Sequence, residues 1–431
     1  MDKFVIEGGK NLRGTIAASG SKNASLPLMA ASLLARGTFT IHHTPDLQDV
    51  HTLSNLLRII GCRVQFTRET QDLLINTEHV HHYEAPYELV KKMRASIYVL
   101  GPLLARYGYA RVSLPGGCAW GPRPVDLHIE GMKQLGAEVD LDGGYIIAKK
   151  DRLVGNRIKF PISSVGATGN VLMAAVLAKG ESLIENAAIE PEIVALEEFL
   201  VAMGAKIQGV GTRTLTVQGV DSLYPTHFNN IPDRIEIGTF MVAAGLTRGD
   251  VTITNVIPDH IRSVADHLEQ SGCRIEWGTS QVRVTGGEQI RPVNVITDVF
   301  PGFPTDMQAQ WIAYMTQANG PSTLVDQIYF DRWKHVPELE RLNARLKTDG
   351  NACKIEAPAV LKGATVMSTD LRASATLILA GLVAKGTTEV LRVYHLDRGY
   401  ESLEKKLAAL GAGIRREHYE EFSKSDVQEE S

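Results

Sequence analysis

The chain has 431 residues, 44% of them hydrophobic, and a formal net charge of -4. A chain of this length is expected to form roughly two to four domains, and its apolar content is sufficient for a large core. The near-neutral charge gives no basic face and disfavours nucleic-acid binding, and no apolar run is long enough to cross a bilayer. Four cysteines in so long a chain do not form a disulfide framework, and the sequence begins without a secretory signal pattern. These features predict a globular cytoplasmic protein with neither membrane nor nucleic-acid partners.

A repeated element of about 70 residues organises the chain. Its first marker is a residue, Gly in five copies and Asn in one, that follows a helix-like segment and precedes a strand-like one. These residues are Gly61, Gly136, Gly204, Gly272, Asn343 and Gly411. We expect a left-handed backbone at each of them, because Gly adopts it freely and Asn tolerates it.

A second series of glycines alternates with the first, and each follows an Ala/Leu-rich segment. These are Gly37, Gly108, Gly180, Gly249, Gly320 and Gly386. Helices that end near Gly and lead into short β-branched segments indicate α/β layers, with the apolar helices as the core. The sequence therefore predicts six α/β units.

The loop over residues 114–126 contains Cys118 and is the longest of its kind. Gly108 and Gly136 are 28 residues apart, against 23 to 25 in the other five units, and the excess falls at this loop. Loops that lengthen on a repeated scaffold tend to be functional. Glycines before Cys118 and Arg123 after it suit a thiol for acid or nucleophilic chemistry. The alternative is a Gly/Pro-rich surface loop with an incidental cysteine.

The other three cysteines are predicted to be structural. Cys62 and Cys273 occupy a position that holds Ala in other units, so we expect them to be buried small residues. Cys353 lies in a predicted strand. Only Cys118 has a loop environment with glycines and a nearby arginine.

Charged residues recur at equivalent positions of the units. Counting back 14 or 15 residues from each glycine of the second series gives Lys22, Arg94, Gly166, Arg234, Asp306 and Arg372. Counting forward 12 residues gives Asp49, Trp120, Glu192, Ile261, Arg332 and Arg398. The first set lies at predicted helix starts, which bind phosphate well, whereas cations there oppose the helix dipole. These positions therefore indicate a ligand site; the alternative is that charged residues simply favour helix starts and solvent.

Longer motifs follow one another in a fixed order. They are Ser-Lys-Asn-Ala (21–24), Lys-Met-Arg-Ala-Ser (92–96), Pro-Gly-Gly-Cys (115–118), Arg-Pro-Val-Asp-Leu-His (123–128), Ser-Val-Gly-Ala-Thr (164–168), Phe-Pro-Thr-Asp-Met-Gln-Ala-Gln (303–310), Asp-Leu-Arg-Ala-Ser (370–374) and Asp-Arg-Gly-Tyr (397–400). Together they resemble the UDP-N-acetylglucosamine 1-carboxyvinyltransferases, enolpyruvyl transferases that begin peptidoglycan synthesis. The resemblance extends from residue 1 to about residue 416.

The resemblance implies a two-domain α/β fold. Each domain would be an inside-out α/β barrel of three units, with the active site in the cleft between the domains. The domains would be 22–230, with the Cys118 loop, and 1–21 together with 231–419. The first strand or two would thus join the C-terminal units. Residues 420–431 are charged and Ser-rich, and we expect a disordered tail.

The resemblance also implies a reaction. The enolpyruvyl group of phosphoenolpyruvate would move to the 3′-hydroxyl of UDP-N-acetylglucosamine, with release of phosphate, as the first committed step of peptidoglycan synthesis. Cys118 would be the acid, and the target of fosfomycin, and Asp306 would be the base. Lys22, Arg123 and Arg398 would hold phosphoenolpyruvate, with Lys22 and Arg398 counted among the catalytic groups, and Asn23 would bond the tetrahedral intermediate.

The remaining residues would bind the sugar nucleotide. The resemblance assigns its uridine diphosphate end to Arg94, Arg123, Pro124, Val125, Asp126, Leu127, Ser163, Ser164, Val165 and Gly166. Asp306 and Ile328 would contact the sugar, and Arg332 and Arg372 would add positive charge to the substrate site. No cofactor is implied, and no metal site is expected because no His/Cys/Asp ligand spacing stands out.

Some features depart from the family pattern, and rival functions exist. Ala119-Trp120 follows the cysteine, Pro161-Ile162-Ser163 stands where some members have a lysine just before the Ser-Val-Gly motif, and Trp333 is unusual. The sibling enolpyruvyl shikimate-phosphate synthase lacks the cysteine loop, and a cysteine phosphatase needs Cys-x5-Arg where this chain has Cys-x4-Arg. A non-catalytic repeat protein would not need the aligned charges. A paralogue that binds without turnover would not need both Cys118 and Asp306.

Overall fold

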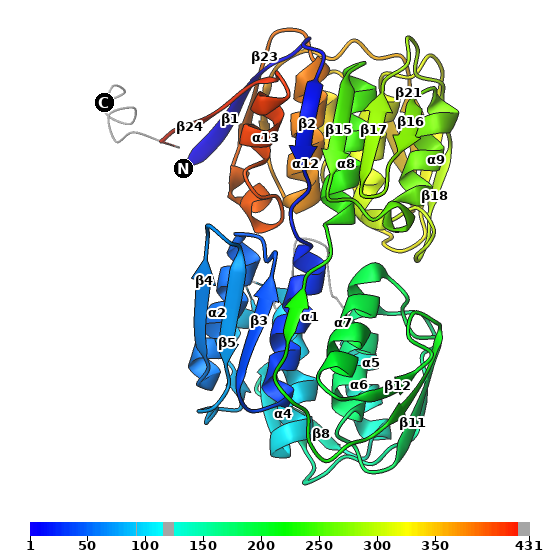
Figure 1. Ribbon diagram of the computed structural model, residues 1–431. Coiled ribbons are helices and arrows are strands. Elements are labelled where there is room, and N and C mark those ends of the chain that lie inside the picture. Colours follow the sequence, from blue (N-terminus) through cyan, green and yellow to red (C-terminus); the bar gives the residue numbers. More distant parts are fainter. Residues whose placement is uncertain (92, 115–124, 421–431) are drawn as a thin grey trace, which may run out of the picture. The chain divides into compact units, whose positions relative to one another are not determined.

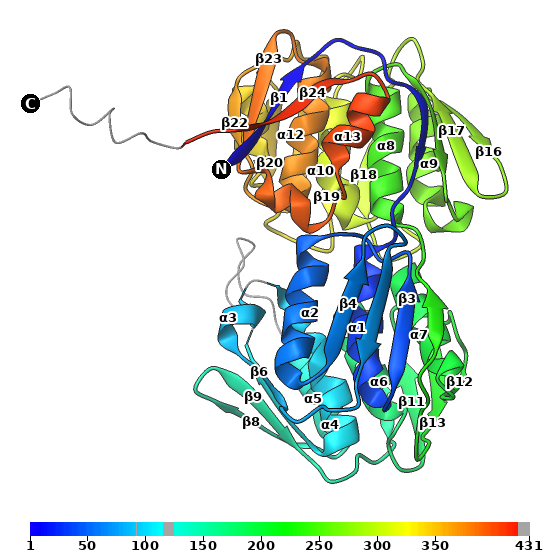
Figure 2. The same cartoon turned by 60° about the vertical axis from the view of Figure 1, so that its left-hand side comes forward.

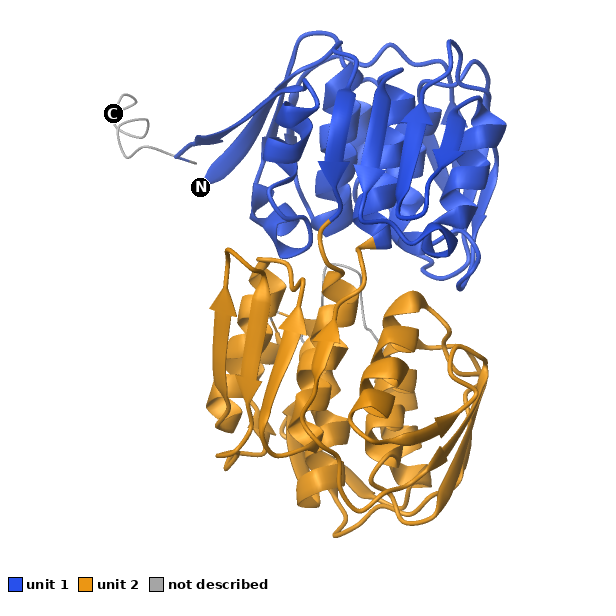
Figure 3. Ribbon diagram, in the orientation of Figure 1, with its two compact units in different colours: residues 1–18, 234–431 blue, residues 19–233 orange. Residues whose placement is uncertain are grey.

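The structure is a computed structural model, and it describes residues 1–91, 93–114 and 125–420. Cys118, Arg123 and Pro124 and the predicted tail from 421 onward lie outside the described residues. The chain divides into two compact units (Figure 3). Unit 1 comprises Met1–Ala18 and the chain from Arg234 onward, and unit 2 comprises Ser19–Asp233. The boundaries expected from the resemblance were 21/22 and 230/231.

Three four-stranded sheets of unit 2 share one topology, in which two parallel strands are followed by an antiparallel pair. The first sheet has the order β14 (His227–Asn229), β3 (Thr38–His42), β5 (Asp72–Asn76), β4 (Arg63–Thr67). The second is β6 (Glu84–Ala85), β7 (Tyr109–Ser113), β9 (Tyr145–Lys149), β8 (Glu138–Asp142). The third is β10 (Arg157–Lys159), β11 (Glu181–Glu185), β13 (Thr214–Gln218), β12 (Lys206–Gln208).

Unit 1 repeats this topology three times and uses the N-terminus to complete it. Its sheets are β2 (Arg13–Ala17), β15 (Asp250–Thr254), β17 (Gln281–Thr285), β16 (Arg274–Trp277); β18 (Val295–Thr297), β19 (Ser322–Asp326), β21 (Ala352–Glu356), β20 (Arg345–Asp349); and β22 (Thr365–Met367), β23 (Thr387–Leu391), β1 (Asp2–Glu7), β24 (Gly413–His418). β1 lies between β23 and β24, and β2 pairs with β15 (Figure 1). The first two strands therefore join the C-terminal units, as the resemblance implied.

The first helix of each repeat is central and buried. These helices are α1 (Lys22–Ala31), α4 (Leu100–Tyr107), α6 (Val165–Ala175), α8 (Arg234–Leu246), α10 (Gln308–Met315) and α12 (Leu371–Val383). All eight residues of α10 are buried, as are residues 235–246 of α8. A helix that is apolar on every side belongs in a core. In unit 1, α8, α10 and α12 pack on one another inside the sheets (Figure 2), which is the predicted inside-out arrangement.

Each repeat also has a second helix. In chain order these helices are α2 (Gln48–Ile60), α5 (Asp126–Gln134), α7 (Pro191–Ala202), α9 (Arg262–Ser271), α11 (Val336–Arg341) and α13 (Leu403–Ala409). Shorter helical turns are α3 (Tyr87–Val90) and the 3-10 helices η1 (Ser32–Leu34), η2 (Arg94–Val99), η3 (Pro258–His260), η4 (Thr305–Met307) and η5 (Val393–Arg398).

The left-handed residues predicted at the first marker are confirmed, including Asn343 with φ 71°. A strand begins two residues after each of them.

Of the second series, Gly108 alone directly follows an α-helix, since α4 ends at Tyr107. Gly249 and Gly320 also lack the left-handed backbone of the other four, and their helices α8 and α10 end at Leu246 and Met315. Near Gly249 the left-handed residue is Arg248, with φ 52°. A Cβ at position 249 would lie 2.3 Å from the carbonyl oxygen of Leu12. Gly249 is therefore required for the close approach of two backbones, not as a left-handed helix terminator.

Candidate active site

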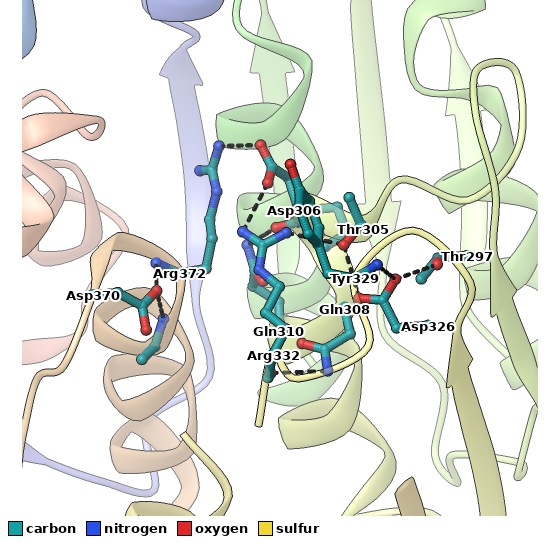
Figure 4. Close-up of polar contacts among 12 residues, drawn as sticks. Thr297, Thr305, Asp306, Gln308, Gln310, Asp326, Tyr329, Arg332, Asp370 and Arg372 are labelled. Carbon is teal, nitrogen blue, oxygen red and sulfur yellow. Dashed lines mark hydrogen bonds and ion pairs between the residues drawn. The ribbon is translucent and has the colours of Figure 1, made fainter. Parts of the chain in front are cut away.

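Asp306 lies in η4, at the entrance to α10, and its carboxylate is held between two arginines (Figure 4). Oδ1 is 2.9 Å from Nη2 of Arg332, and Oδ2 is 2.8 Å from Nη2 of Arg372. The arginine side chains are 9% and 7% exposed, whereas Asp306 keeps 28% exposure. The structure thus brings together three of the predicted site residues in unit 1.

The charge of Asp306 is set by opposing effects. Burial acts to raise the pKa of its carboxyl, but the charges of Arg372 and Arg332 and their hydrogen bonds outweigh burial. The net result is a pKa held well below the usual range. Asp306 is therefore an anion at neutral pH.

Arg372 is fixed at both ends. Asp370 caps α12, and its Oδ1 accepts hydrogen bonds from the backbone N–H groups of Arg372 and Ala373, at 2.8 and 3.1 Å. This carboxylate offsets the unfavourable placement of a cation near a helix N-terminus. At the other end, Nη1 of Arg372 donates to the hydroxyl of Tyr400 at 3.2 Å. Tyr400 is 1% exposed and is itself bonded to Thr239 at 2.8 Å.

Two further predicted residues of unit 1 lie close to this cluster in the chain. Ile328 follows β19, and its backbone N–H donates to Oδ1 of Asp326 at 3.0 Å. Arg398 ends η5, two residues before Tyr400, and it is partly buried. Ile328 and Arg398 thus flank residues that position the ion-paired cluster.

In unit 2, Lys22 begins α1, directly after its N-cap Ser21. Its Nζ lies 3.1 Å from Oδ2 of Asp49, in the first turn of α2, and the two side chains are 12% and 5% exposed. Asn23 is the next residue of α1 and is partly buried. The repeat had singled out Lys22 and Asp49, but it did not predict that they pair.

The predicted nucleotide-binding segments include the N-termini of α5 and α6. Ser164 caps α6, accepting a hydrogen bond from the backbone of Ala167 at 3.3 Å, and Ser163 precedes it. Val125, Asp126 and Leu127 begin α5. The two helix starts are adjacent, because a Cβ on Gly166 would lie 3.1 Å from Nε2 of His128. Free N–H groups at helix starts bind phosphates.

Arg94 begins η2 and acts electrostatically on the same region. Burial, and then the positive charge of Arg94, lower the pKa of His128 to about 3. His128 is therefore neutral at physiological pH, and its Nδ1 lies 3.0 Å from Nδ2 of Asn170. No role was predicted for His128, although the residue ends one of the motifs.

The three described cysteines are structural, as predicted. Cys62, Cys273 and Cys353 are 5%, 7% and 0% exposed. Burial raises the pKa of Cys62 and Cys353 to about 12, and it also raises the pKa of Cys273. These thiols are protonated and shielded at neutral pH. The proposed acid Cys118 and its neighbour Arg123 fall outside the described residues.

Among residues 1–91, 93–114 and 125–420, which the structure describes, no helix has the length and hydropathy needed to span a membrane. The same residues contain no group of three or more His, Cys, Asp or Glu side chains arranged to hold a metal ion.

Comparison with known proteins identifies the family. The family model described as EPSP synthase (3-phosphoshikimate 1-carboxyvinyltransferase) matches residues 6–407. A protein of Chloroherpeton thalassium named UDP-N-acetylglucosamine 1-carboxyvinyltransferase is 60% identical over 99% of this chain and 100% of its own length. A protein of the same name from Chlorobaculum parvum is 58% identical over 98% of this chain and 100% of its own length.

Solved structures agree with this assignment. The enolpyruvyl transferase NikO from Streptomyces tendae superposes with a TM-score of 0.87 at 25% identity, over 97% of this chain and 99% of its own. EPSP synthase from Acinetobacter baumannii has a TM-score of 0.74 at 18% identity, over 97% of this chain and 100% of its own, and supports the fold alone. The resemblance drawn from the motifs is confirmed: the chain belongs to the EPSP synthase family, together with the UDP-N-acetylglucosamine 1-carboxyvinyltransferases.

Proposed function

We propose that this protein transfers the enolpyruvyl group of phosphoenolpyruvate to the 3′-hydroxyl of UDP-N-acetylglucosamine and releases phosphate. The observation that carries the proposal is 60% identity, over 99% of the chain, to a protein named for this reaction. The reaction is the first committed step of peptidoglycan synthesis. It takes place in the cytoplasm, where phosphoenolpyruvate and sugar nucleotides are made.

The chemistry requires one base and one acid. Asp306 takes the proton of the sugar hydroxyl while the sugar oxygen forms a bond to C2 of phosphoenolpyruvate. Cys118 delivers a proton to the CH2 carbon, which produces a tetrahedral intermediate. That carbon then returns a proton to the Cys118 thiolate while the C2–O bond to phosphate breaks, which yields the enol ether, and the phosphate leaves with the proton that Asp306 had taken. The anionic state of Asp306 supports its role as base.

Cations hold the phosphoenolpyruvate. Lys22, Arg123 and Arg398 bind its phosphate and carboxylate. Lys22 contributes a compact positive charge, and the two guanidinium groups match both anions with paired hydrogen bonds. Asn23 donates a hydrogen bond to the tetrahedral intermediate. Arg332 and Arg372 compensate the charge of Asp306 in the resting enzyme and stabilise the anions that form during transfer.

The sugar nucleotide is bound at its two ends. Ile328 and Asp306 contact the sugar. The uridine diphosphate is bound by helix-start N–H groups and by cations: Arg94, Arg123, Pro124, Val125, Asp126, Leu127, Ser163, Ser164, Val165 and Gly166. Ser164 and Gly166 lie at the first turn of α6, where the N–H groups are not used by the helix, and this supports phosphate binding there.

Phosphate release from phosphoenolpyruvate, measured with alternative acceptors, tests the proposal. We expect release only when UDP-N-acetylglucosamine is present. Shikimate 3-phosphate serves as the matched acceptor, because it is the substrate of the sibling reaction. Release with shikimate 3-phosphate and none with the sugar nucleotide would replace the proposed function by that of the sibling enzyme.

A further inference from the structure

Asp326 is a fully buried carboxylate that no predicted role had included. It ends β19, is 0% exposed, and accepts four hydrogen bonds. Oδ1 accepts from the hydroxyl of Thr297 at 2.7 Å and from the backbone N–H groups of Ile328 and Tyr329 at 3.0 and 3.1 Å. Oδ2 accepts from the hydroxyl of Thr305 at 2.8 Å. Two of the four donors are backbone N–H groups, which hold the carboxylate in one orientation.

Thr305 connects this buried carboxylate to the ion-paired cluster. Its hydroxyl donates to Asp326, so its lone pairs face away and accept from Nη1 of Arg332 at 3.0 Å. Nη2 of the same guanidinium bonds Oδ1 of Asp306 at 2.9 Å. A continuous chain of hydrogen bonds therefore runs from Asp326 through Thr305 and Arg332 to Asp306 (Figure 4).

The direction of the Thr305 hydroxyl determines how these hydrogen bonds position Arg332. A threonine hydroxyl has one proton, and the carboxylate acceptor at Asp326 fixes where that proton points. The remaining lone pairs then face the side from which Arg332 donates. The guanidinium is rigid and planar, so fixing Nη1 also fixes Nη2 against the carboxylate of Asp306.

We propose that Asp326 is a positioning residue for the transfer reaction, acting through Thr305 to hold Arg332 against the base Asp306. This inference rests on the proposed function, because it assigns Asp306 as the base. Asp326 also orders the chain after β19, where its bonds to Ile328 and Tyr329 fix the backbone that contacts the sugar. One buried carboxylate thus sets both the charge environment of the base and the position of a sugar-binding residue.

The proposal predicts an effect on the acidity of Asp306. Arg332 is one of the two cations that hold the pKa of Asp306 well below its usual range. If Arg332 is no longer fixed, that pKa rises, and Asp306 becomes protonated at a higher pH. The acid limb of the kcat/KM profile must then move to higher pH, which a purely structural role of Asp326 does not require.

Three variants at two threonines test the hydrogen bonds that join Asp326 to Arg332 through Thr305. Thr305→Val removes the hydroxyl at nearly constant volume, and Thr305→Ser restores it. Thr297→Val removes a different hydrogen bond to Asp326 and leaves the bond from Arg332 to Thr305 intact. Rates are measured across pH with wild type and each variant, and thermal unfolding confirms that each variant is folded.

We expect Thr305→Val to lower kcat/KM by about 10- to 100-fold, the effect of one lost hydrogen bond to a charged group, and to move the acid limb upward. Thr305→Ser should restore both, and Thr297→Val should leave the acid limb in place. Asp326→Asn should reproduce the shift of Thr305→Val. In the double variant Thr305→Val/Asp326→Asn, the two losses of kcat/KM should not add, because both substitutions act through Arg332.

The outcomes are separable. An unchanged acid limb in both Thr305→Val and Asp326→Asn would overturn the inference, as would equal shifts in Thr305→Val and Thr297→Val. Wild-type protein that releases no phosphate with UDP-N-acetylglucosamine would instead overturn the proposed function on which it rests.

Discussion

Lys22 and Asp49 form an ion pair in unit 2, with Nζ and Oδ2 3.1 Å apart. Asp306 and Arg332 form an ion pair at the equivalent repeat positions in unit 1, with the charges reversed. In each repeat the first partner lies near the start of a central helix, and the second lies some 12 residues after the glycine that follows that helix. The repeat thus supplies one geometry that places a cation at this helix start in one copy and a carboxylate in the other.

The Lys22–Asp49 pair should be energetically coupled, because both side chains are largely removed from solvent. Removing either charge leaves the other without this partner, so Lys22→Met and Asp49→Asn should each destabilise unit 2. The double variant should be more stable than the sum of the single effects predicts, with a coupling energy of about 1–3 kcal/mol. Urea unfolding of all four proteins measures this energy. Additive effects would show that the pair contributes nothing specific.

Asp306→Asn should abolish most turnover while it preserves the fold. Asn has the same shape, but it cannot accept the proton of the sugar hydroxyl. We expect kcat to fall by roughly 10²-fold or more, the scale of general-base catalysis. Binding of UDP-N-acetylglucosamine, measured by calorimetry, should remain detectable. Turnover close to that of wild type would remove Asp306 from the role of base.

The ion pairs of Asp306 should also make stability depend on pH in a defined window. Its pKa is lower in the folded protein than in the unfolded chain, so its contribution to stability is complete above about pH 5 and declines as the pH falls further. The difference in unfolding free energy between wild type and Asp306→Asn should therefore be constant from about pH 5.5 to 8 and should shrink in acid. A difference that grows below pH 4 would contradict the assigned direction of the pKa shift.

The sequence predicted the repeat because its markers depend on local chemistry. A left-handed helix end accepts few residue types, so Gly and Asn reveal it, and Asn343 adopts φ 71° as expected. The central helices were predicted because apolar residues cover them on all sides. The close backbone approach at Gly249 was not predicted, because it involves Leu12, a residue far away in the sequence.

The site was predicted in part. The contacts that were not predicted join residues that lie far apart in the sequence. Helix starts carry cap signals, so the placements of Lys22, Gly166, Asp306 and Arg372 could be read from the repeat. The partners of these residues could not. Asp326 ends a strand and is joined to Thr297 and Thr305 from other segments, so its role depends on packing that no local pattern encodes.

Cys118 should be the thiol that fosfomycin alkylates. The other three cysteines are buried, and burial raises the pKa of Cys62 and Cys353 to about 12, so they offer almost no thiolate at neutral pH. Peptide mapping by mass spectrometry after treatment should locate the adduct on Cys118. Cys118→Asp should retain some turnover as an alternative acid, whereas Cys118→Ala should lose most of it. An adduct mainly on Cys353, or full activity in Cys118→Ala, would exclude the assigned role.

The structure of the reaction product tests the central claim most directly. Purified protein is incubated with phosphoenolpyruvate and UDP-N-acetylglucosamine, and the nucleotide product is analysed by mass spectrometry and NMR, with Cys118→Ala and Asp306→Asn as controls. The account predicts an enolpyruvyl ether at the 3′-oxygen of the sugar, formed together with phosphate and nearly absent with both variants. Unmodified sugar nucleotide after incubation with wild-type protein, or an enolpyruvyl group on a different oxygen, would contradict it.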